Sequence, residues 1–173
     1  GHPRPAVQTF RGTPHSEMFP QDLKEKLEVL GRGEGVTLFM TLCAAFNALL
    51  FRWTGQEDIV IGSTMSGRNR AEFEALIGLF INTLVLRTDL SGNPTFRDLL
   101  GRVRETALGA YANQEMPFDK VMERLHSKRS LSHGTLFQVL FVLHQGTSQQ
   151  DLTLSGLTVS KVPVEIGTVK FAL

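Results

Sequence analysis

Cysteine is almost absent from this sequence, and that scarcity excludes several kinds of stabilising site. The 173 residues include one cysteine, Cys43, so there is no internal disulfide and no cysteine pair spaced for zinc. Because Cys43 lies in an apolar stretch with a helical pattern, we expect a buried and unreactive thiol. A reducing, cytoplasmic setting is the matching expectation.

The chain also lacks an excess of either charge and a long hydrophobic run. Its 18 basic and 17 acidic side chains leave a net charge of +1, which disfavours nucleic-acid binding and attachment to an anionic membrane. With 42% apolar and 20% charged residues, the composition fits a packed globular domain. We expect no membrane span, because polar residues interrupt the most apolar stretch, Val36–Trp53, at Thr37, Thr41, Asn47 and Arg52.

Familiar catalytic and metal-binding motifs are missing as well. The sequence has no HExxH motif and no GxSxG turn, and no two of its histidines are adjacent. Gly31, Gly33 and Gly35 follow a helical pattern and do not match a phosphate loop, so a helix end is the better interpretation. We expect no metal site, because no histidine has a partner at ligand spacing; the histidines are His2, His15, His126, His133 and His144.

Helices are predicted where apolar residues recur at spacings of three and four. One begins at Pro20 and ends near the three glycines, and the next begins after Thr37 and ends at Gly55. A third is predicted from Asn93 as cap with Pro94 in the first position, and a fourth follows Pro117. The predicted buried faces are Leu23, Leu27 and Leu30; Leu38, Leu42, Ala45, Leu49 and Trp53; Phe96, Leu100, Val103 and Ala107; and Phe118, Val121, Met122 and Leu125.

Runs of branched residues predict strands between these helices. The predicted strands are 58–63, 81–88 and 136–143, with weaker ones at 15–19, 157–164 and 169–173 and a short helix at 72–77. Irregular alternation of helices and strands favours an α/β two-layer sandwich, with helices packed on a mixed β-sheet. We expect residues 1–14 to form an extended linker, since they carry Pro3, Pro5, Gly12 and Pro14.

Three segments carry more information than a generic core. They are Ile77–Thr83 (IGLFINT) with Arg87, Asn113–Asp119 (NQEMPFD), and Arg129–Ser132 followed by Leu136–Phe141 (LFQVLF). In this order and spacing they resemble the fifth, sixth and seventh core motifs of nonribosomal peptide synthetase condensation domains. The resemblance runs from about Pro3 to Phe171.

The resemblance implies the fold and the reaction of that family. Residues 15–173 would form part of the C-terminal lobe of a domain that resembles chloramphenicol acetyltransferase, with a tunnel between two lobes. Its full-length parent would join an acyl or peptidyl thioester to an aminoacyl thioester, forming an amide bond. The implied partners are peptidyl carrier proteins, the N-terminal lobe and adjoining synthetase domains, with phosphopantetheine arms as substrates and no directly bound cofactor.

The family's HHxxxDG motif, which lies in the N-terminal lobe, does not occur in these residues. We therefore expect no catalytic residue here and no activity from the chain alone. The resemblance implies that Asn82 lies near the tunnel, where its amide can donate to a thioester carbonyl and accept from an amine. A strand-end asparagine that satisfies backbone groups is the alternative.

Arg68 is a second positioning candidate, able to pair with a carboxylate across the lobe interface. The other motif residues are expected to act as scaffold: Gly78, Phe80, Arg87, Gln114, Pro117, Phe118 and Phe137. Two other functions remain open at this point. One is a noncatalytic docking module for carrier proteins, and the other is a lobe of a coenzyme A-dependent acyltransferase.

Overall fold

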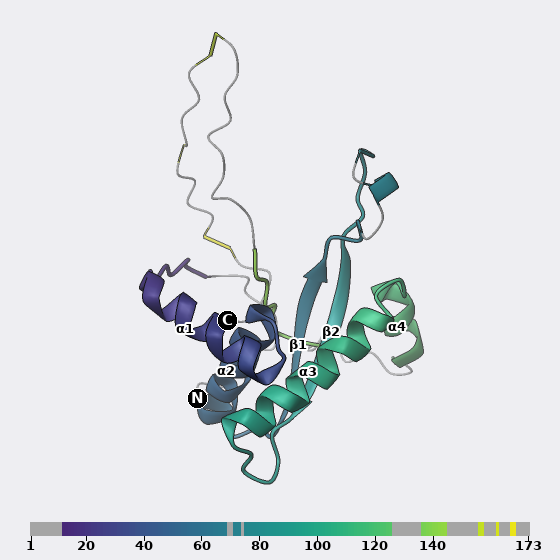
Figure 1. Ribbon diagram of the computed structural model, residues 1–173. Helices are drawn as coiled ribbons and strands as arrows, with labels where there is room; N and C mark the ends of the chain where they lie inside the picture. The colour runs from purple at the N-terminus through teal and green to yellow at the C-terminus, as the bar shows by residue number, and fades with distance from the viewer. Residues whose placement is uncertain are drawn as a thin grey trace.

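The computed structural model of the chain describes residues 12–68, 71–73, 75–125, 136–144, 156–157, 162 and 167–168. Helices and strands alternate irregularly along these ranges, as the sequence predicts (Figure 1). The elements are α1 (Gln21–Glu34), α2 (Leu38–Thr54), β1 (Asp58–Met65), the 3-10 turn η1 (Ala71–Phe73), β2 (Asn82–Asp89), α3 (Phe96–Ala112) and α4 (Phe118–Leu125).

The strands β1 and β2 form an antiparallel hairpin, in register from Asp58 opposite Asp89 to Met65 opposite Asn82. On the other edge of β1, Gly62 makes a parallel bridge with Leu140. In the described residues the sheet is thus a two-stranded antiparallel hairpin with one parallel bridge at its edge, rather than the mixed sheet of several strands that was expected. In Figure 1 the connection between the two strands, which carries η1, extends beyond the helices.

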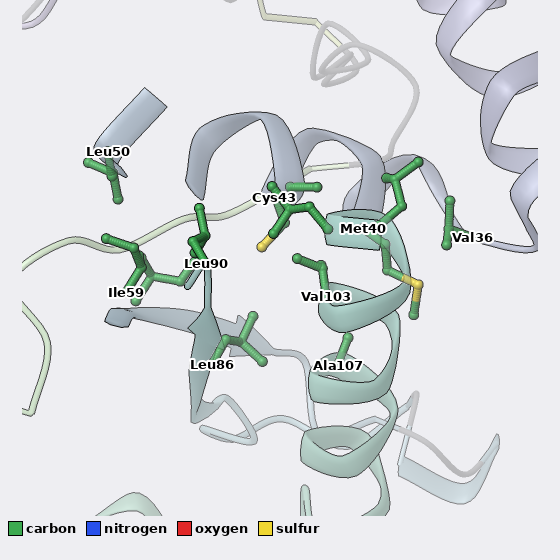
Figure 2. Close-up of a cluster of buried hydrophobic side chains, with 13 residues drawn as sticks. Val36, Met40, Cys43, Leu50, Ile59, Leu86, Leu90, Val103 and Ala107 are labelled. Atoms are coloured by element: carbon green, nitrogen blue, oxygen red, sulfur yellow. The ribbon is translucent and has the colours of Figure 1, made fainter. Parts of the chain in front are cut away.

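The core lies between α2, α3 and the hairpin. Figure 2 shows Met40 and Cys43 of α2 beside Val103 of α3, with Leu86 of β2 below them. Helices packed against a β-sheet are the arrangement of the predicted α/β class, which is confirmed. The buried cluster consists of Val36, Met40, Cys43, Ala44, Leu50, Ile59, Ile61, Leu86, Leu90, Leu99, Leu100, Val103 and Ala107.

Within the described ranges, no single helix is long and apolar enough to cross a membrane. The helices α1 and α2 reach the required length and composition only as a pair, and the chain bends by 100° between them.

The predicted face of α2 is wrong in part. Leu49 is 50% exposed and Trp53 75% exposed, whereas Met40, Cys43 and Asn47 are buried. Almost the whole circumference of this helix is apolar, so its period leaves the inward direction open, and packing against α3 and β2 decides it. The prediction of a buried Cys43 is confirmed.

The end of α1 agrees with the prediction, which placed it near the three glycines. The helix α1 continues through Gly31 to Glu34, and Gly35 ends it in the left-handed conformation (φ 66°) while Val36 donates a backbone hydrogen bond to Gly31 (2.8 Å). Gly31 stays inside the helix because a Cβ there would lie 2.8 Å from the carbonyl oxygen of Val36. Close packing, rather than a helix end, accounts for this glycine.

The helix α3 begins later than predicted. Asn93 lies in the preceding turn with φ 50°, and Thr95 is the cap instead of Asn93, with Phe96 instead of Pro94 in the first position. The Thr95 hydroxyl accepts from the Asp98 amide (3.3 Å), and the Asp98 carboxylate accepts from the Thr95 amide (3.0 Å). This reciprocal pair satisfies two backbone donors, which Asn93 alone would not do. Phe96 is correspondingly 40% exposed.

Three predicted elements are shorter than expected or absent. Residues 15–19 form no strand, and the helix expected at 72–77 is the three-residue turn η1. Residues 136–143 make one isolated bridge to β1 rather than a full strand. Several predictions lie outside the described residues: most of the linker 1–14, the segment Arg129–Ser132, the strand 169–173, most of the strand 157–164, and His2, His126 and His133.

Candidate functional site

An open pocket of about 490 Å³ lies where β2 begins, beside the loop that follows α3. Its walls are mainly apolar, with two amides and one carboxyl among them. Two of the three sequence motifs meet here although about 30 residues separate them. The lining residues are Gly67, Phe73, Leu79, Phe80, Ile81, Asn82, Gln114, Glu115 and Pro117.

Asn82 is the centre of this arrangement. Its Nδ2 donates hydrogen bonds to the carbonyl oxygens of Gln114 and Met116, both at 2.8 Å. Its Oδ1 accepts from the backbone N–H groups of Phe118 (3.3 Å) and Thr83 (2.9 Å). A primary amide has two donors and two acceptor sites, so these four bonds use all of them.

The Asn82 cluster, meaning Asn82 with the backbone groups of Gln114, Met116 and Phe118, fastens the loop after α3 to the start of β2. These contacts favour the alternative in which a strand-end asparagine satisfies backbone groups. To donate to a thioester carbonyl, the amide would have to release one loop carbonyl. A direct contact between Asn82 and substrate stays a prediction.

The loop runs from Asn113, the residue after α3, to Pro117, the residue before α4. The backbone N–H of Met116 donates to the carbonyl oxygen of Asn113 (3.1 Å), which closes a turn. The carbonyl oxygen of Pro117 accepts the first hydrogen bond of α4, from Val121 (3.3 Å). A proline fits this position because the backbone N–H that it lacks would find no partner inside the helix.

The third motif reaches the same site through aromatic packing. The rings of Phe118 and Phe137 lie 5.7 Å apart at 52°, and Phe137 is only 4% exposed. Phe137 precedes the residues that pair with β1 around Gly62. The described parts of all three motifs therefore form one contact network, and the predicted scaffold residues Gln114, Pro117, Phe118 and Phe137 all belong to it.

Arg68 organises the connection between β1 and β2. Its guanidinium donates to the carbonyl oxygens of Phe73 and Leu76, the latter at 2.8 Å, and lies over the Phe80 ring at 4.4 Å from the ring centre. The rings of Phe73 and Phe80 stack at 5.8 Å. Arg68 thus folds the segment with η1 back onto the pocket rim. Its predicted pairing with a carboxylate across a lobe interface stays a prediction.

Two glycines make this fold of the connection possible. Gly67 has φ 64°, and a Cβ there would overlap the carbonyl oxygen of Phe80. A Cβ on Gly78 would lie 3.1 Å from the Phe80 ring, tighter than most such contacts. Sequence reasoning named Gly78 and Phe80 as scaffold but missed Gly67, whose place beside Arg68 in a polar, glycine-bearing loop was the available signal.

Arg87 lies away from the pocket. It makes a bidentate ion pair with Asp58, with Nε–Oδ1 at 2.9 Å and Nη2–Oδ2 at 2.8 Å. The hydrogen bonds from Arg87 lower the pKa of Asp58 below its usual value. Arg87 lies five residue steps along β2 from Asn82, roughly 17 Å at 3.3–3.4 Å per step, so its pairing holds the far end of the hairpin.

The other reactive side chains described here do not gather at the pocket. Burial raises the pKa of the Cys43 thiol to about 12, so the thiol stays protonated near neutral pH. His144 is exposed, and His15 contacts only the exposed Glu17 (3.3 Å) among the described groups. Among the described residues, no three His, Cys, Asp or Glu side chains lie as metal ligands would.

Comparison with known proteins gives one family. The model of the "Condensation domain" family matches residues 1–173. One protein of the linear gramicidin synthase of Brevibacillus parabrevis is 61% identical over 141 residues, which is 82% of this chain and 2% of that protein. Another protein of the same synthase is 52% identical over 175 residues, covering 99% of this chain and 3% of that protein.

Among solved structures, the X-domain in its complex with OxyB from teicoplanin biosynthesis matches with a TM-score of 0.81 and 27% identity. That match covers 98% of this chain and 36% of the X-domain chain. The chain therefore spans a small part of the curated relatives it matches and about a third of this solved neighbour.

Proposed function

The chain belongs to the condensation domain family of nonribosomal peptide synthetases, and we propose that its parent domain forms amide bonds between two carrier-bound thioesters. The parent domain is the full condensation domain that contains these residues. The amine nitrogen of an aminoacyl thioester attacks the carbonyl carbon of an acyl or peptidyl thioester. A C–N bond forms and a C–S bond breaks, and the proton lost by the amine ends on the released thiol.

The observation that carries this proposal is the convergence of the family's motifs on one pocket. Asn82, Gln114 and Pro117 line it. The backbone N–H of Phe118 donates to Asn82, and the ring of Phe137 packs on the ring of Phe118. A thioester reaction needs its two carbonyl-bearing chains held in fixed geometry, and a pocket wall of apolar side chains with a few hydrogen-bonded polar groups would help to supply that. The high identity to the linear gramicidin synthase proteins supports the same assignment.

In this proposal, the groups that transfer protons lie outside these 173 residues. The chain has no adjacent histidines and no HHxxxDG, and its buried Cys43 holds its proton. The amine must lose a proton and the tetrahedral oxyanion needs donors, both of which would come from the N-terminal lobe. We infer that the 173 residues on their own form no amide bond.

The proposed partners are peptidyl carrier proteins, whose phosphopantetheine arms deliver both substrates. Condensation domains work beside adjoining synthetase domains, as in a solved four-domain nonribosomal peptide synthetase. The N-terminal lobe would close the pocket from the side that these residues leave open. No directly bound cofactor is needed for the reaction, because the thioester already carries the activated carbonyl.

A docking role is the second candidate. It is favoured by the likeness to the X-domain, which was solved as a complex with OxyB. In that role the parent domain would bind a protein partner without forming a bond. A coenzyme A-dependent acyltransferase is the third candidate, and no contact in the described residues favours it.

One assay separates these functions. The parent domain is mixed with two loaded carrier proteins, and amide formation is followed by mass spectrometry of the downstream carrier. A second reaction replaces the upstream carrier with the same acyl group on coenzyme A, and a third uses the 173-residue chain alone. Carrier-dependent product from the parent domain alone is expected.

Equal product from the coenzyme A thioester would favour the acyltransferase. Carrier binding with no product in any reaction would favour docking. Product from the isolated chain at the rate of the parent domain would contradict the inference that these residues lack the proton-transfer groups.

A further inference from the structure

Gly62 occupies a crowded position in the middle of β1. On one side it pairs with Val85 of β2. On the other, its N–H donates to the carbonyl oxygen of Val139 (2.9 Å) and its carbonyl oxygen accepts from the N–H of Phe141 (2.8 Å). The residue thus joins the hairpin to the segment that carries Phe137.

The absence of a side chain at Gly62 is what admits the Phe137 ring. A Cβ there would lie 2.7 Å from Cδ2 of Phe137 and closer still to Cε2 and Cζ. The φ of Gly62 is not positive, so its backbone conformation is open to any residue. Gly67, by contrast, has φ 64° and needs glycine for its backbone as well. At Gly62 the requirement is therefore for space alone.

The Phe137 ring is connected to the pocket through Phe118 and Asn82. Phe137 is 4% exposed and packs against the ring of Phe118 at 5.7 Å. The backbone N–H of Phe118 in turn donates to Oδ1 of Asn82 (3.3 Å). Asn82 lines the pocket. A side chain at Gly62 would displace the Phe137 ring, and the displacement would reach the pocket wall through one ring contact and one hydrogen bond.

We propose that Gly62 is a positioning residue for the pocket wall, acting through the rings of Phe137 and Phe118. This inference rests on the proposed function, because it makes the wall the binding surface for one of the two carrier-bound thioesters. Gly62 touches neither substrate. Its contribution is the space that fixes where the Asn82 cluster sits.

The test is Gly62→Ala in the parent domain, with apparent KM measured separately for each loaded carrier protein. We expect the KM for one carrier-bound substrate to rise about tenfold, with the other within about twofold. A second substitution, Phe137→Leu, removes Cε2 and Cζ, the two ring atoms nearest to the new methyl group. The double variant G62A/F137L should recover at least half of the lost affinity.

The matched control is Gly101→Ala in α3. Gly101 is exposed and a Cβ there meets nothing within 4 Å, so this variant should leave both KM values unchanged. A loss of folded protein would lower kcat in proportion and leave both KM values alone, because the remaining molecules keep an intact site. A lower kcat with two unchanged KM values would therefore overturn the positioning role, as would wild-type kinetics.

A second measurement does not depend on turnover. Hydrogen exchange at the Phe118 amide reports its bond to Asn82, and we expect G62A to speed it about tenfold and G62A/F137L to restore it. Unchanged exchange would overturn the inference. G62A could also speed exchange at Phe118 in a parent domain that forms no amide bond. That result would support the contacts of Gly62 and contradict the proposed function.

Discussion

Replacing Asn82 with alanine removes every side-chain hydrogen bond of the Asn82 cluster at once. The carbonyl oxygens of Gln114 and Met116 lose their donor, and the Phe118 amide loses its acceptor. The loop between α3 and α4 then keeps its internal turns but loses its fastening to β2.

The size of this effect follows from the three bonds that reach the loop. Each intramolecular hydrogen bond contributes about 1 kcal/mol net, which gives an upper value of about 3 kcal/mol. The contact at Met116 is exposed, so water replaces part of it, and we expect a loss of about 2 kcal/mol. A local opening that is easier by this amount speeds amide exchange about 30-fold.

Hydrogen exchange of the parent domain, resolved at the Phe118 amide, measures this directly. Asn113→Ala is the matched control, because Asn113 is an exposed asparagine whose side chain donates one bond, to the carbonyl oxygen of Gly109 within its own helix (2.9 Å). We expect that control to change exchange at Phe118 by less than about threefold. Asn82→Asp should resemble the alanine variant, because it keeps the acceptors but loses both donors.

One result would contradict the role of Asn82 in holding the loop. If Asn82→Ala lowered the condensation rate while exchange at Phe118 stayed at the wild-type value, the amide would act on substrate rather than on the loop. The direct tunnel contact predicted from the sequence would then be correct, and the loop would be held by other contacts.

Three further outcomes are expected of the parent domain. Arg87→Ala should raise the pKa of Asp58 toward its ordinary value, which NMR titration of the carboxyl carbon measures. In the wild type the lowered pKa of Asp58 stabilises the folded state at pH values above the unfolded-state pKa of about 3.9. This stabilisation is lost as the pH falls through the pKa of Asp58 in the folded state. An unchanged titration curve would argue against the ion pair. Cys43 should react with a thiol reagent at pH 8 only after denaturant is added, because burial raises its pKa to about 12, and labelling of the native protein would contradict this. Thr95→Ala should cost about 1 kcal/mol in urea unfolding through loss of the α3 cap, and an unchanged midpoint would contradict the capping pair with Asp98.

Helix starts and ends can be predicted where the residues that form the cap are neighbours in the sequence. Thr37 caps α2 and Gly55 ends it in the left-handed conformation, both as expected. The prediction fails where two local signals compete. Asn93–Pro94 and Thr95–Asp98 both indicate a helix start, and the second wins because it satisfies two backbone donors instead of one.

The pattern of residues within α2 does not predict which face of the helix is buried. Its apolar residues surround the helix, and the buried set includes the polar Asn47, whose Nδ2 donates to the Thr88 hydroxyl (3.2 Å). That bond joins residues 41 positions apart, so no periodicity in the helix indicates it.

The sequence motifs indicate several of the residues that line or contact the pocket, but not how these residues are arranged. The motif resemblance indicates Asn82, Gln114, Pro117, Phe118 and Phe137, yet spacing alone does not show that one amide joins the first motif to the second. Gly62 lies in none of the three motifs, and its role depends on a ring that lies far along the chain, at Phe137.

A double-variant cycle between Asn82 and Phe137 tests the claim that the motifs form one unit. Asn82→Ala, Phe137→Ala and the double variant of the parent domain are compared by kcat/KM for amide formation. If both residues hold the same wall, the double variant should lose little more than the more damaging single variant, a coupling of about tenfold or more. Losses that multiply to within about twofold would mean that the two residues act independently, and would contradict a shared wall.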